Sequence, residues 1–357
     1  MRVCYFGTYD PNYTRNKLMI QGLKENGIEV VECRVLQNRH KLKKYWQLIK
    51  LHKSLKKNYD VMIVGFAGHA IMPLAWLLAK LTGKKIILDL FVSEYDSVIL
   101  DRKAYPVKSW QAYKFWLLDW LSCQLADICL LDAFEHINFI AGNFKIKPEK
   151  FRLIFVSCDP KIFYPREKPT NERFVIHYHG SYSPIQGVKY IIGAAKLLEK
   201  ENIIFNIIGK LKNHQKEIDL ASELGLKNVN FINFMTYEKL AGQISLADLV
   251  LGMFGDTDKA MHCSAFKIVE GMAMKKPVVT GDTPALRELI KDRQSGLFCR
   301  MADAKDLADK ILEIKNNPQL ASQIAEGGYQ FYLKNLTPKI TGAELTKVIN
   351  QLIIKNN

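Results

Sequence analysis

Acidic residues are scarce in this sequence relative to basic ones. Its 357 residues include 36 Asp and Glu against 51 Lys and Arg, which gives a formal net charge of +15 at pH 7. Such a surplus indicates an anionic partner: a nucleic acid, an anionic membrane or a phosphorylated substrate. Because no helix-turn-helix, zinc-finger or RNA-binding sheet signature occurs, we do not expect nucleic acid to be that partner.

Paired cysteines are also missing. The chain has seven cysteines; none belongs to a CxxC pair, and most of them lie in apolar runs. A free cysteine in such a run behaves as a small hydrophobic side chain. We therefore expect neither a zinc site nor a disulfide framework, and a reducing compartment, the cytoplasm, fits best.

A signal peptide and a membrane span are not expected either. Residues 1–7 have the pattern of a strand that enters a glycine turn. Residues 61–79 are nearly uncharged and close to spanning length, but Gly65, Gly68 and Pro73 interrupt them. A strand, a turn and a buried helix explain this segment better.

The basic surplus is concentrated in one segment, Arg39–Lys57, which holds eight Lys or Arg and no acid. Tyr45, Leu48 and His52 recur on one side at helical spacing. A basic helix with an aromatic-bearing apolar side is typical of binding to a membrane surface, so we predict contact with an anionic membrane here. The alternative is a helix packed on its own sheet with a solvated basic back.

Apolar strands and helices alternate along the whole chain, which predicts parallel sheets covered on both faces. The expected strands are 2–6, 28–34, 60–64, 85–90 and 127–131, and then 174–179, 203–208, 229–232, 249–253, 277–280 and 297–298. The segment Asp159–Arg173 between the two series is rich in proline and charge and has the composition of a linker. We therefore predict an α/β fold of two doubly wound, Rossmann-like domains that face a cleft: residues 1–165, completed by a helix at 340–357, and residues 166–339.

One stretch of the second half has the composition of a ligand site. A loop at 252–264 leads into an expected helix, Ala265–Met274, which carries Lys267 and Glu270 on adjacent turns. Loops at the carboxyl edge of a parallel sheet bind ligands, and the N–H groups of a first helical turn attract phosphate. Lys259 and Lys267 would add positive charge, and Glu270 would accept ribose hydroxyls. The alternative is a solvated loop followed by a surface Lys–Glu pair.

The same residues carry a family resemblance. Phe266–Thr280 resembles the K-x-x-E-x-M-A-x-G-K-P-V segment of the retaining GT-B glycosyltransferases, a large family 4-like group typified by sucrose and glycogen synthases and bacterial lipid-glycan glycosyltransferases. Thr283–Ile290 and Ser295–Phe298 follow at the family's spacing. Asp159–Pro165 is similar to its interdomain D-x-x-x-F-x-P, and Tyr178–Val188 to the glycine turn before its first carboxyl-domain helix. The resemblance covers essentially the whole chain.

Two departures from the family pattern concern the donor. The earlier of the family's two glutamates is replaced by His262, which puts its mode of sugar recognition in doubt. Where the family has an Arg and a Lys that bind the diphosphate, this chain resembles it in position but has Ser181 and Gln186. The diphosphate would therefore depend on Lys259, Lys267 and backbone N–H groups. A branch of the family with an F-G-x-T-x-K-A…K-x-x-E arrangement is closer to this chain.

The resemblance implies a function and a set of site residues. The first domain would bind the acceptor and the second the nucleotide sugar, which is a co-substrate; no cofactor and no metal are expected. Asp256 and Asp258 spell a D-x-D, but a metal role for that loop is not expected. The donor-binding set would be Gly180, Ser181, Gly209, Lys210, Gly255, Lys259, His262, Lys267 and Glu270; the acceptor-binding set Tyr9, Asp10, Arg15 and Ser93; and the catalytic set Asp89, Asp96 and Lys267.

Alternatives remain for these residues and for the activity. Loop capping would equally explain the aspartates and Ser93, and a surface ion pair would explain Arg15. The expected activity is retaining, metal-independent hexosyl transfer from a nucleotide-diphosphate sugar to a lipid-linked or glycan acceptor, by a cytoplasmic protein held at the inner face of the membrane. The alternatives are a non-catalytic nucleotide-sugar-binding partner in a glycan-assembly complex and a nucleotide-sugar epimerase of the same fold.

Overall fold

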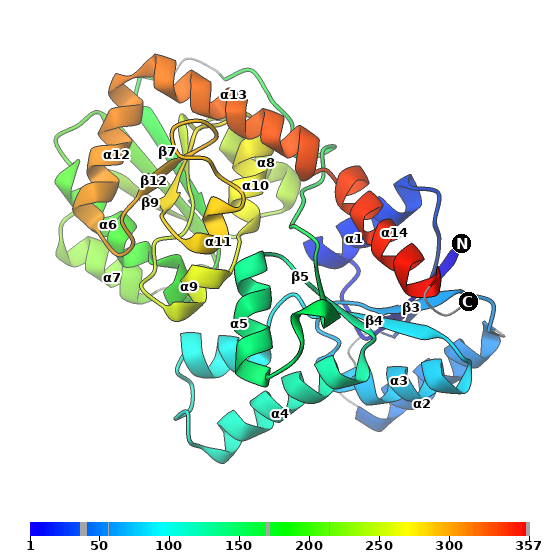
Figure 1. The fold of residues 1–357 in the computed structure, drawn as a ribbon. Coiled ribbons are helices and arrows are strands. Elements are labelled where there is room, and N and C mark those ends of the chain that lie inside the picture. Colours follow the sequence, from blue (N-terminus) through cyan, green and yellow to red (C-terminus); the bar gives the residue numbers. More distant parts are fainter. Residues whose placement is uncertain (36–40, 56, 169–171, 214, 355–357) are drawn as a thin grey trace. The chain divides into compact units, whose positions relative to one another are not determined.

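The chain folds into two compact units. The computed structural model describes residues 1–35, 41–55, 57–168, 172–213 and 215–354. The first unit comprises Met1–Ser157 and Pro338–Asn357, and the second comprises Cys158–Thr337 (Figure 1). Each unit is an α/β domain with its own six-stranded parallel sheet, which confirms the predicted fold class.

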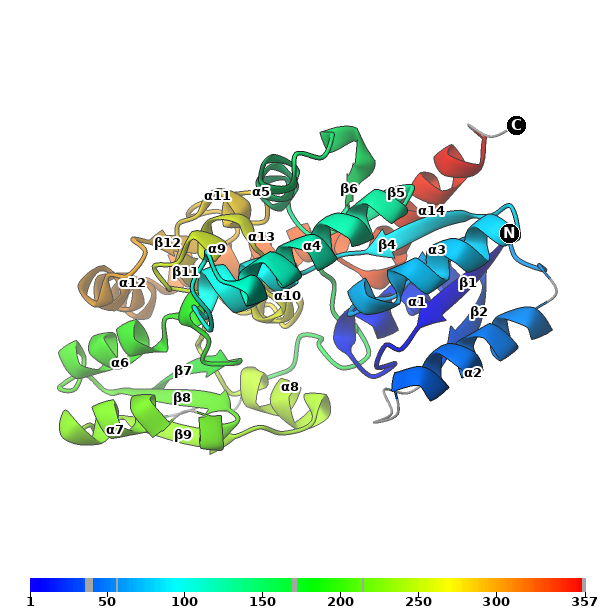
Figure 2. The same ribbon diagram turned by 90° about the horizontal axis from the view of Figure 1, so that it is seen from below.

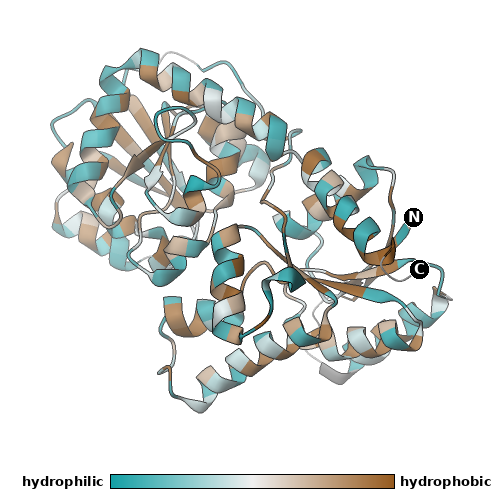
Figure 3. Ribbon diagram, viewed as in Figure 1, coloured by the Kyte–Doolittle hydropathy of each residue, from teal (hydrophilic) through white to brown (hydrophobic). Residues whose placement is uncertain are grey.

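The sheet of the first unit has the strand order β2-β1-β3-β4-β5-β6. Its strands are β1 (Arg2–Gly7), β2 (Glu29–Arg34), β3 (Val61–Val64), β4 (Lys85–Asp89), β5 (Ile128–Leu131) and β6 (Phe151–Leu153). The central strands are apolar without alternation because both of their faces are buried. Figure 3 shows these strands mostly in the brown of hydrophobic residues.

Helices cover both faces of this sheet. On one face, α1 (Thr14–Glu25) and α14 (Pro338–Ile354) enclose one apolar core. On the other face, α2 (Lys41–Ser54), α3 (Met72–Leu81), α4 (Trp110–Leu125) and α5 (Phe134–Phe144) enclose a second core (Figure 2). Short helical turns lie at η1 (His69–Ile71), η2 (Asp96–Asp101) and η3 (Pro148–Lys150).

Two glycines allow the carboxyl-terminal helix to pack on the first unit. A methyl group built on Gly22 of α1 would lie 2.3 Å from the carbonyl oxygen of Pro338, and one on Gly342 of α14 would lie 2.2 Å from the carbonyl carbon of Gly22. The backbones of the two helices therefore touch where they cross. This contact fixes the end of the chain to its beginning.

The basic helix α2 packs on its own sheet. Leu48 is fully buried in the core, the His52 ring bonds the Tyr59 hydroxyl at 2.7 Å, and the Tyr45 hydroxyl donates to the Ala70 carbonyl at 3.2 Å. The apolar side that suggested a membrane surface is thus used inside the protein. Of the predicted segment, residues 39, 40 and 56 lie outside the described residues.

The sheet of the second unit has the order β12-β11-β10-β7-β8-β9. Its strands are β7 (Phe174–His179), β8 (Ile203–Gly209), β9 (Val229–Asn233), β10 (Leu249–Leu251), β11 (Val278–Gly281) and β12 (Leu297–Cys299). The chain runs outward from β7 through β8 to β9, and then returns to β10 on the other side of β7. The strand order therefore reverses between β7 and β10.

The helices of the second unit complete the doubly wound pattern. They are η4 (Pro184–Gln186), α6 (Val188–Leu197), η5 (Leu211–Asn213), α7 (Gln215–Glu223), α8 (Tyr237–Ser245), α9 (Asp258–His262), α10 (Phe266–Ala273), α11 (Pro284–Arg287), α12 (Ala304–Asn316) and α13 (Pro318–Asn335). The helices α6, α7 and α12 contribute to one core, and α10 packs against α13. In the parts of the chain that the structure describes, no helix is long and apolar enough to cross a bilayer.

Candidate functional site

The strand-order reversal of the second unit provides the candidate site. Ligands of open parallel sheets bind beyond the carboxyl ends of the strands at such a point. The loop after β7 and the loop after β10 meet there: the Phe254 N–H donates to the Gln186 carbonyl at 3.2 Å, and the Gly255 N–H donates to the Ile185 carbonyl at 3.1 Å. The two loops are therefore held together as one backbone platform.

Glycine is required at the contact between these loops. Gly187 has a φ of +63°, and a methyl group on it would lie 2.5 Å from the Gly255 nitrogen. A methyl group on Gly255 would lie 2.1 Å from the Pro184 carbonyl oxygen. Gly255, which the sequence predicted to bind the donor, thus serves the close approach of two backbones.

Lys267 occupies the first turn of α10 and is buried. Its Nζ donates to Oε1 of Gln186 and lies 4.0 Å from the ring centroid of Tyr178. Burial lowers the pKa of Lys267 to about 7, although the nearby Glu270 acts in the opposite direction. A side chain on Gly180 would come within 2.8 Å of Nζ, so Gly180, with a φ of +152°, leaves room for the ammonium group.

Glu270 lies one turn further along α10 and is held by a chain of two histidines. The His179 Nε2 is 2.6 Å from Glu270 Oε2, and the His179 Nδ1 is 2.9 Å from the His177 Nε2. If Glu270 is ionised, His179 donates to it, His177 donates to His179, and the His177 Nδ1 is left as a buried nitrogen without a hydrogen-bond partner. Burial lowers the pKa of His177 well below its ordinary value, and His179 and Lys267 lower it further.

These histidines and Tyr178 were not in the predicted site. His177 and His179 stand two residues apart on β7, so both side chains lie on the same face of the sheet. That spacing was visible in the sequence. Their pairing with Glu270, 91 residues away along the chain, was not.

Three further predicted donor residues, Ser181, Gly209 and Lys210, lie just after β7 and at the end of β8. The Ser181 hydroxyl is exposed and lies 3.3 Å from the Ser183 hydroxyl. The ring of Tyr182 would be 2.4 Å from a methyl group on Gly209. The Lys210 Nζ lies 5.9 Å from the centroid of the Phe234 ring.

Lys259 and His262 lie on α9, a short helix that packs against η4, and both side chains are buried. In the preceding D-x-D, the Asp256 carboxylate accepts a hydrogen bond from the Tyr190 hydroxyl at 3.0 Å. The donor roles of Lys259 and His262 stay predictions.

Two residues predicted for different roles in the first unit form one buried ion pair. Arg15 donates to both oxygens of Asp89 at 3.0–3.2 Å, and its other nitrogen donates to the carbonyls of Ile154 and Phe155. Arg15 is 2% exposed and Asp89 is fully buried, so this is not the surface pair considered above. Burial raises the pKa of Asp89, and the guanidinium of Arg15 opposes that rise.

Ser93 and Asp96 lie in a buried turn after β4. The Ser93 hydroxyl donates to Asp119 Oδ2 at 2.6 Å and accepts from the Asp96 N–H at 3.0 Å. Ser93 is therefore in the position of a capping serine for the helical turn that begins at residue 94 and continues into η2. Asp96 is the first residue of η2 and is also buried.

Tyr9 and Asp10 follow β1. The Tyr9 hydroxyl donates to Glu32 Oε2 at 2.9 Å, and Asp10 Oδ1 accepts from the Asn12 N–H at 2.9 Å. Tyr9 is buried and Asp10 is exposed. Asp10 thus makes the side-chain-to-backbone bond that is common in turns, and the acceptor roles of both residues stay predictions.

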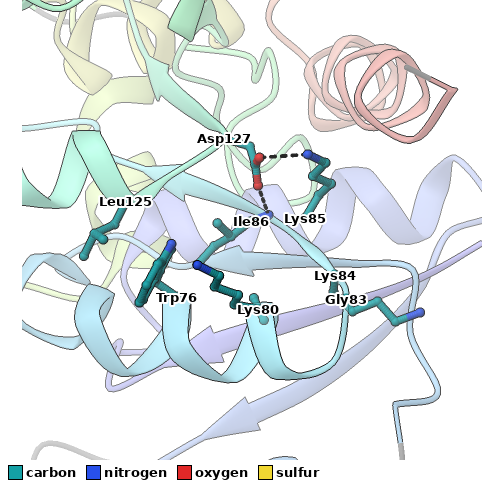
Figure 4. Close-up of a pocket in the computed structure, with 9 residues that line it drawn as sticks. Trp76, Lys80, Gly83, Lys84, Lys85, Ile86, Leu125 and Asp127 are labelled. Atoms are coloured by element: carbon teal, nitrogen blue, oxygen red, sulfur yellow. Dashed lines mark hydrogen bonds and ion pairs between the residues drawn. The ribbon is translucent and has the colours of Figure 1, made fainter. Parts of the chain in front are cut away.

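A pocket of about 270 Å³ lies elsewhere in the first unit, where β4 and β5 begin (Figure 4). It is lined by Trp76, Ala79, Lys80, Gly83, Lys84, Lys85, Ile86, Leu125 and Asp127. Asp127 pairs with Lys85 at 3.1 Å and accepts from the Ile86 N–H at 2.8 Å. The pocket lies at the edge of the sheet where the strands begin, whereas parallel sheets bind their main ligands at the edge where the strands end.

Comparison with known proteins agrees with this arrangement. Residues 161–331 match the family model for glycosyl transferases group 1. An uncharacterized glycosyltransferase of Methanocaldococcus jannaschii is 26% identical over 43% of this chain and 42% of its own length. The alpha-D-kanosaminyltransferase of Streptomyces kanamyceticus is 24% identical over 51% of this chain and 47% of its own length. The chain thus spans about half the length of these two relatives.

The fold has a close counterpart among solved structures. The crystal structure of Anabaena HepE in complex with UDP and glucose superposes with a TM-score of 0.75 at 13% identity, over 98% of this chain and 100% of that one. At 13% identity this similarity shows a common fold. Together with the two parallel-sheet units it shows a GT-B fold, and the group 1 match over residues 161–331 supports a GT-B, glycosyltransferase family 4-like protein.

Proposed function

We propose that the protein is a retaining, metal-independent hexosyltransferase that moves a sugar from a nucleotide-diphosphate sugar to a lipid-linked or glycan acceptor at the cytoplasmic face of a membrane. One observation carries the proposal. Lys267 and Glu270 stand on adjacent turns of α10 beside the strand-order reversal, and each is held by polar residues in or just after β7.

In this proposal Lys267 faces the diphosphate. A transfer from a nucleotide sugar builds negative charge on the leaving phosphate, and a preorganised donor group can be worth roughly 3–4 kcal/mol to such a transition state. Because the pKa of Lys267 is about 7 in the protein without ligand, an arriving diphosphate would favour its protonated form. The interactions with Gln186 and Tyr178 would aim the ammonium group before the donor arrives.

Glu270 binds the ribose in this proposal, and His179 positions it. A carboxylate that already accepts one hydrogen bond from the partly buried His179 cannot rotate freely, so its other oxygen, Oε1, presents a fixed acceptor to a ribose hydroxyl. Burial to 2% exposure strengthens such a bond because water competes less for the carboxylate.

The relatives support a nucleotide sugar as the donor and leave the acceptor open. The HepE structures hold UDP or UDP-glucose, so uridine donors are the first to test. The surplus of basic residues supports an anionic acceptor environment. No cofactor is needed in this proposal, since the leaving diphosphate is stabilised by Lys267 and backbone N–H groups.

The experiment measures release of UDP, GDP or ADP from the corresponding nucleotide-diphosphate sugars, and of CMP from CMP-linked sugars, after a thermal-shift screen with the free nucleotides. Glu270→Ala and Glu270→Gln are compared with Glu326→Ala, which removes an exposed carboxylate of the same unit. We expect the Glu270 variants to weaken nucleotide binding about 10- to 100-fold, as for a hydrogen bond with a charged group, and Glu326→Ala to have no effect.

Other outcomes would favour the alternatives. Binding of a nucleotide sugar without transfer to any acceptor would favour a non-catalytic binding partner. Conversion of the donor sugar without an acceptor would favour an epimerase. If no nucleotide binds, or if binding is unchanged in Glu270→Ala, the proposed donor site is refuted.

A further inference from the structure

A segment of the first unit exposes an unusual run of apolar side chains. The loop that leads into α4 exposes Tyr105 by 41% and Val107 by 59%, and α4 itself exposes Trp110 by 72%, Tyr113 by 52% and Leu117 by 38%. We refer to these five residues as the α4 surface. Single exposed apolar residues are normal, whereas several of them within one short segment are typical of an interaction site.

The helix separates this surface from its core-facing side. Trp110, Tyr113 and Leu117 recur at the spacing of one helix face. Ala112 and Cys123 lie on the opposite side and are fully buried. The exposed stripe is therefore not needed for packing within the unit.

Aromatic contacts keep the exposed rings in place. The ring centroids of Trp110 and Tyr113 are 5.8 Å apart, and Tyr113 stacks on Trp116 at 6.3 Å. Trp116 in turn stacks on Trp120 at 6.1 Å, and both pack against the core. The exposed rings thus continue a row of neighbouring aromatic rings that starts at the core. They therefore lose little side-chain conformational entropy on binding.

The charged residues within the segment that carries the α4 surface all have one sign. Residues 102–118 contain no Asp or Glu, and Arg102, Lys103, Lys108 and Lys114 are all exposed. Within the described part of the chain, no carboxylate pairs with any of these four cations. Such a surface attracts an anionic partner and has no acid that would repel it.

We propose that the α4 surface seats the first unit on an anionic lipid bilayer, with Trp110 and Tyr113 at headgroup level and the four cations against the lipid phosphates. Aromatic rings with an apolar body and a polar edge favour this interface, and lysines beside them gain from the negative surface potential. The inference specifies the membrane partner of the proposed function and rests on it for its biological meaning.

The helices α2 and α3 expose fewer aromatic rings than the α4 surface. The helices α2, α3 and α4 are neighbours in the layer on one face of the sheet (Figure 2). The helix α3 exposes Leu77, Leu81 and Lys80. The helix α2 exposes Trp46, whose ring lies 5.7 Å from the Lys50 Nζ, but keeps its apolar side in the core. The helix that the sequence suggested thus exposes the aromatic ring of Trp46, whereas the α4 surface exposes the rings of Tyr105, Trp110 and Tyr113.

The test is co-sedimentation of the full chain with vesicles of phosphatidylcholine and phosphatidylglycerol in equal parts, and with vesicles of phosphatidylcholine alone. The variants are Trp110→Ser with Tyr113→Ser, and Lys103→Glu with Lys108→Glu; Trp46→Ser is the matched control. We expect binding to the anionic vesicles that falls with salt, and at least about tenfold weaker binding in each double variant. Trp46→Ser should bind like the wild type.

Three results would overturn the proposal: no binding of the wild type to anionic vesicles, an equal loss in Trp46→Ser, or binding to a single-stranded oligonucleotide that the same double variants abolish while vesicle binding persists. A thermal shift with UDP is measured on every variant. The double variants should retain it, because the altered residues lie outside the second unit. A missing shift in the wild type would refute the proposed donor site, whereas lost vesicle binding with an intact shift would refute only the membrane surface.

Discussion

Replacement of Lys267 by methionine should raise stability and weaken nucleotide binding at the same time. The lysine is buried, and its pKa falls from 10.5 to about 7 on folding. At 1.36 kcal/mol per pKa unit, this shift corresponds to roughly 5 kcal/mol of unfavourable linkage. Methionine has a similar length and no charge, and the single proton of the Tyr178 hydroxyl can go to Gln186 Oε1 at 3.2 Å or to the Ser181 carbonyl at 3.1 Å.

The protonation of Lys267 determines how the free energy of unfolding changes with pH. Between pH 7 and 10.5, the unfolded chain holds the Lys267 proton and the folded chain does not. The unfolded state then binds more protons, so the free energy of unfolding of the wild type gains a term that rises with pH across this window. Lys267→Met should lose that term, and its apparent melting temperature at pH 7 should equal or exceed that of the wild type.

Nucleotide binding should respond in the opposite direction. Loss of a hydrogen bond to a charged phosphate costs roughly 1.5–3 kcal/mol, or about 10- to 100-fold in Kd. Wild-type affinity should also fall as pH rises above about 7, where the free lysine loses its proton. Calorimetry with the nucleotide that gives the largest thermal shift, at several pH values, measures both effects.

Lys276 supplies a matched control. It is also buried, with a pKa lowered by burial to about 8, but its Nζ donates to the carbonyls of Ser245 and Ala247 at 2.7 and 2.8 Å. In Lys276→Met the same linkage gain is opposed by two buried carbonyls left without a donor, so the net change in stability should be smaller than in Lys267→Met, and nucleotide binding should be unchanged. If Lys267→Met instead unfolds the protein or binds nucleotide like the wild type, the assignment of Lys267 to the diphosphate is wrong.

Three further predictions concern the scaffold. Asp89→Ala leaves the Arg15 guanidinium buried without its carboxylate, so urea titration should show a loss of about 3–5 kcal/mol in the free energy of unfolding, and an unchanged midpoint would contradict the buried pair. Gly187→Ala places a methyl group against the backbone at a positive φ; it should cost at least about 2 kcal/mol and weaken the nucleotide thermal shift, whereas Gly142→Ala, with open space around it, should do neither. Gly22→Ala forces α1 and α14 apart, so hydrogen exchange in 338–354 should quicken while exchange in the second unit stays unchanged.

Much of the fold was predictable from local pattern. The expected strand 174–179 agrees with β7, because an unbroken apolar run is set by neighbouring residues. The prediction did not include α5 and β6. A strand of three residues such as β6 is too short for its pattern to stand out from a loop.

The sequence by itself determined that two parallel-sheet units occur and that Lys267 and Glu270 share one side of a helix, since both facts follow from spacing along the chain. Only the tertiary structure decided which groups these residues meet. The partners of Glu270 and Arg15 lie 91 and 74 residues away, and the side of α2 that enters the core depends on the sheet beneath it. Such pairings depend on strand order and on the competition of all buried groups for partners, which no local period records.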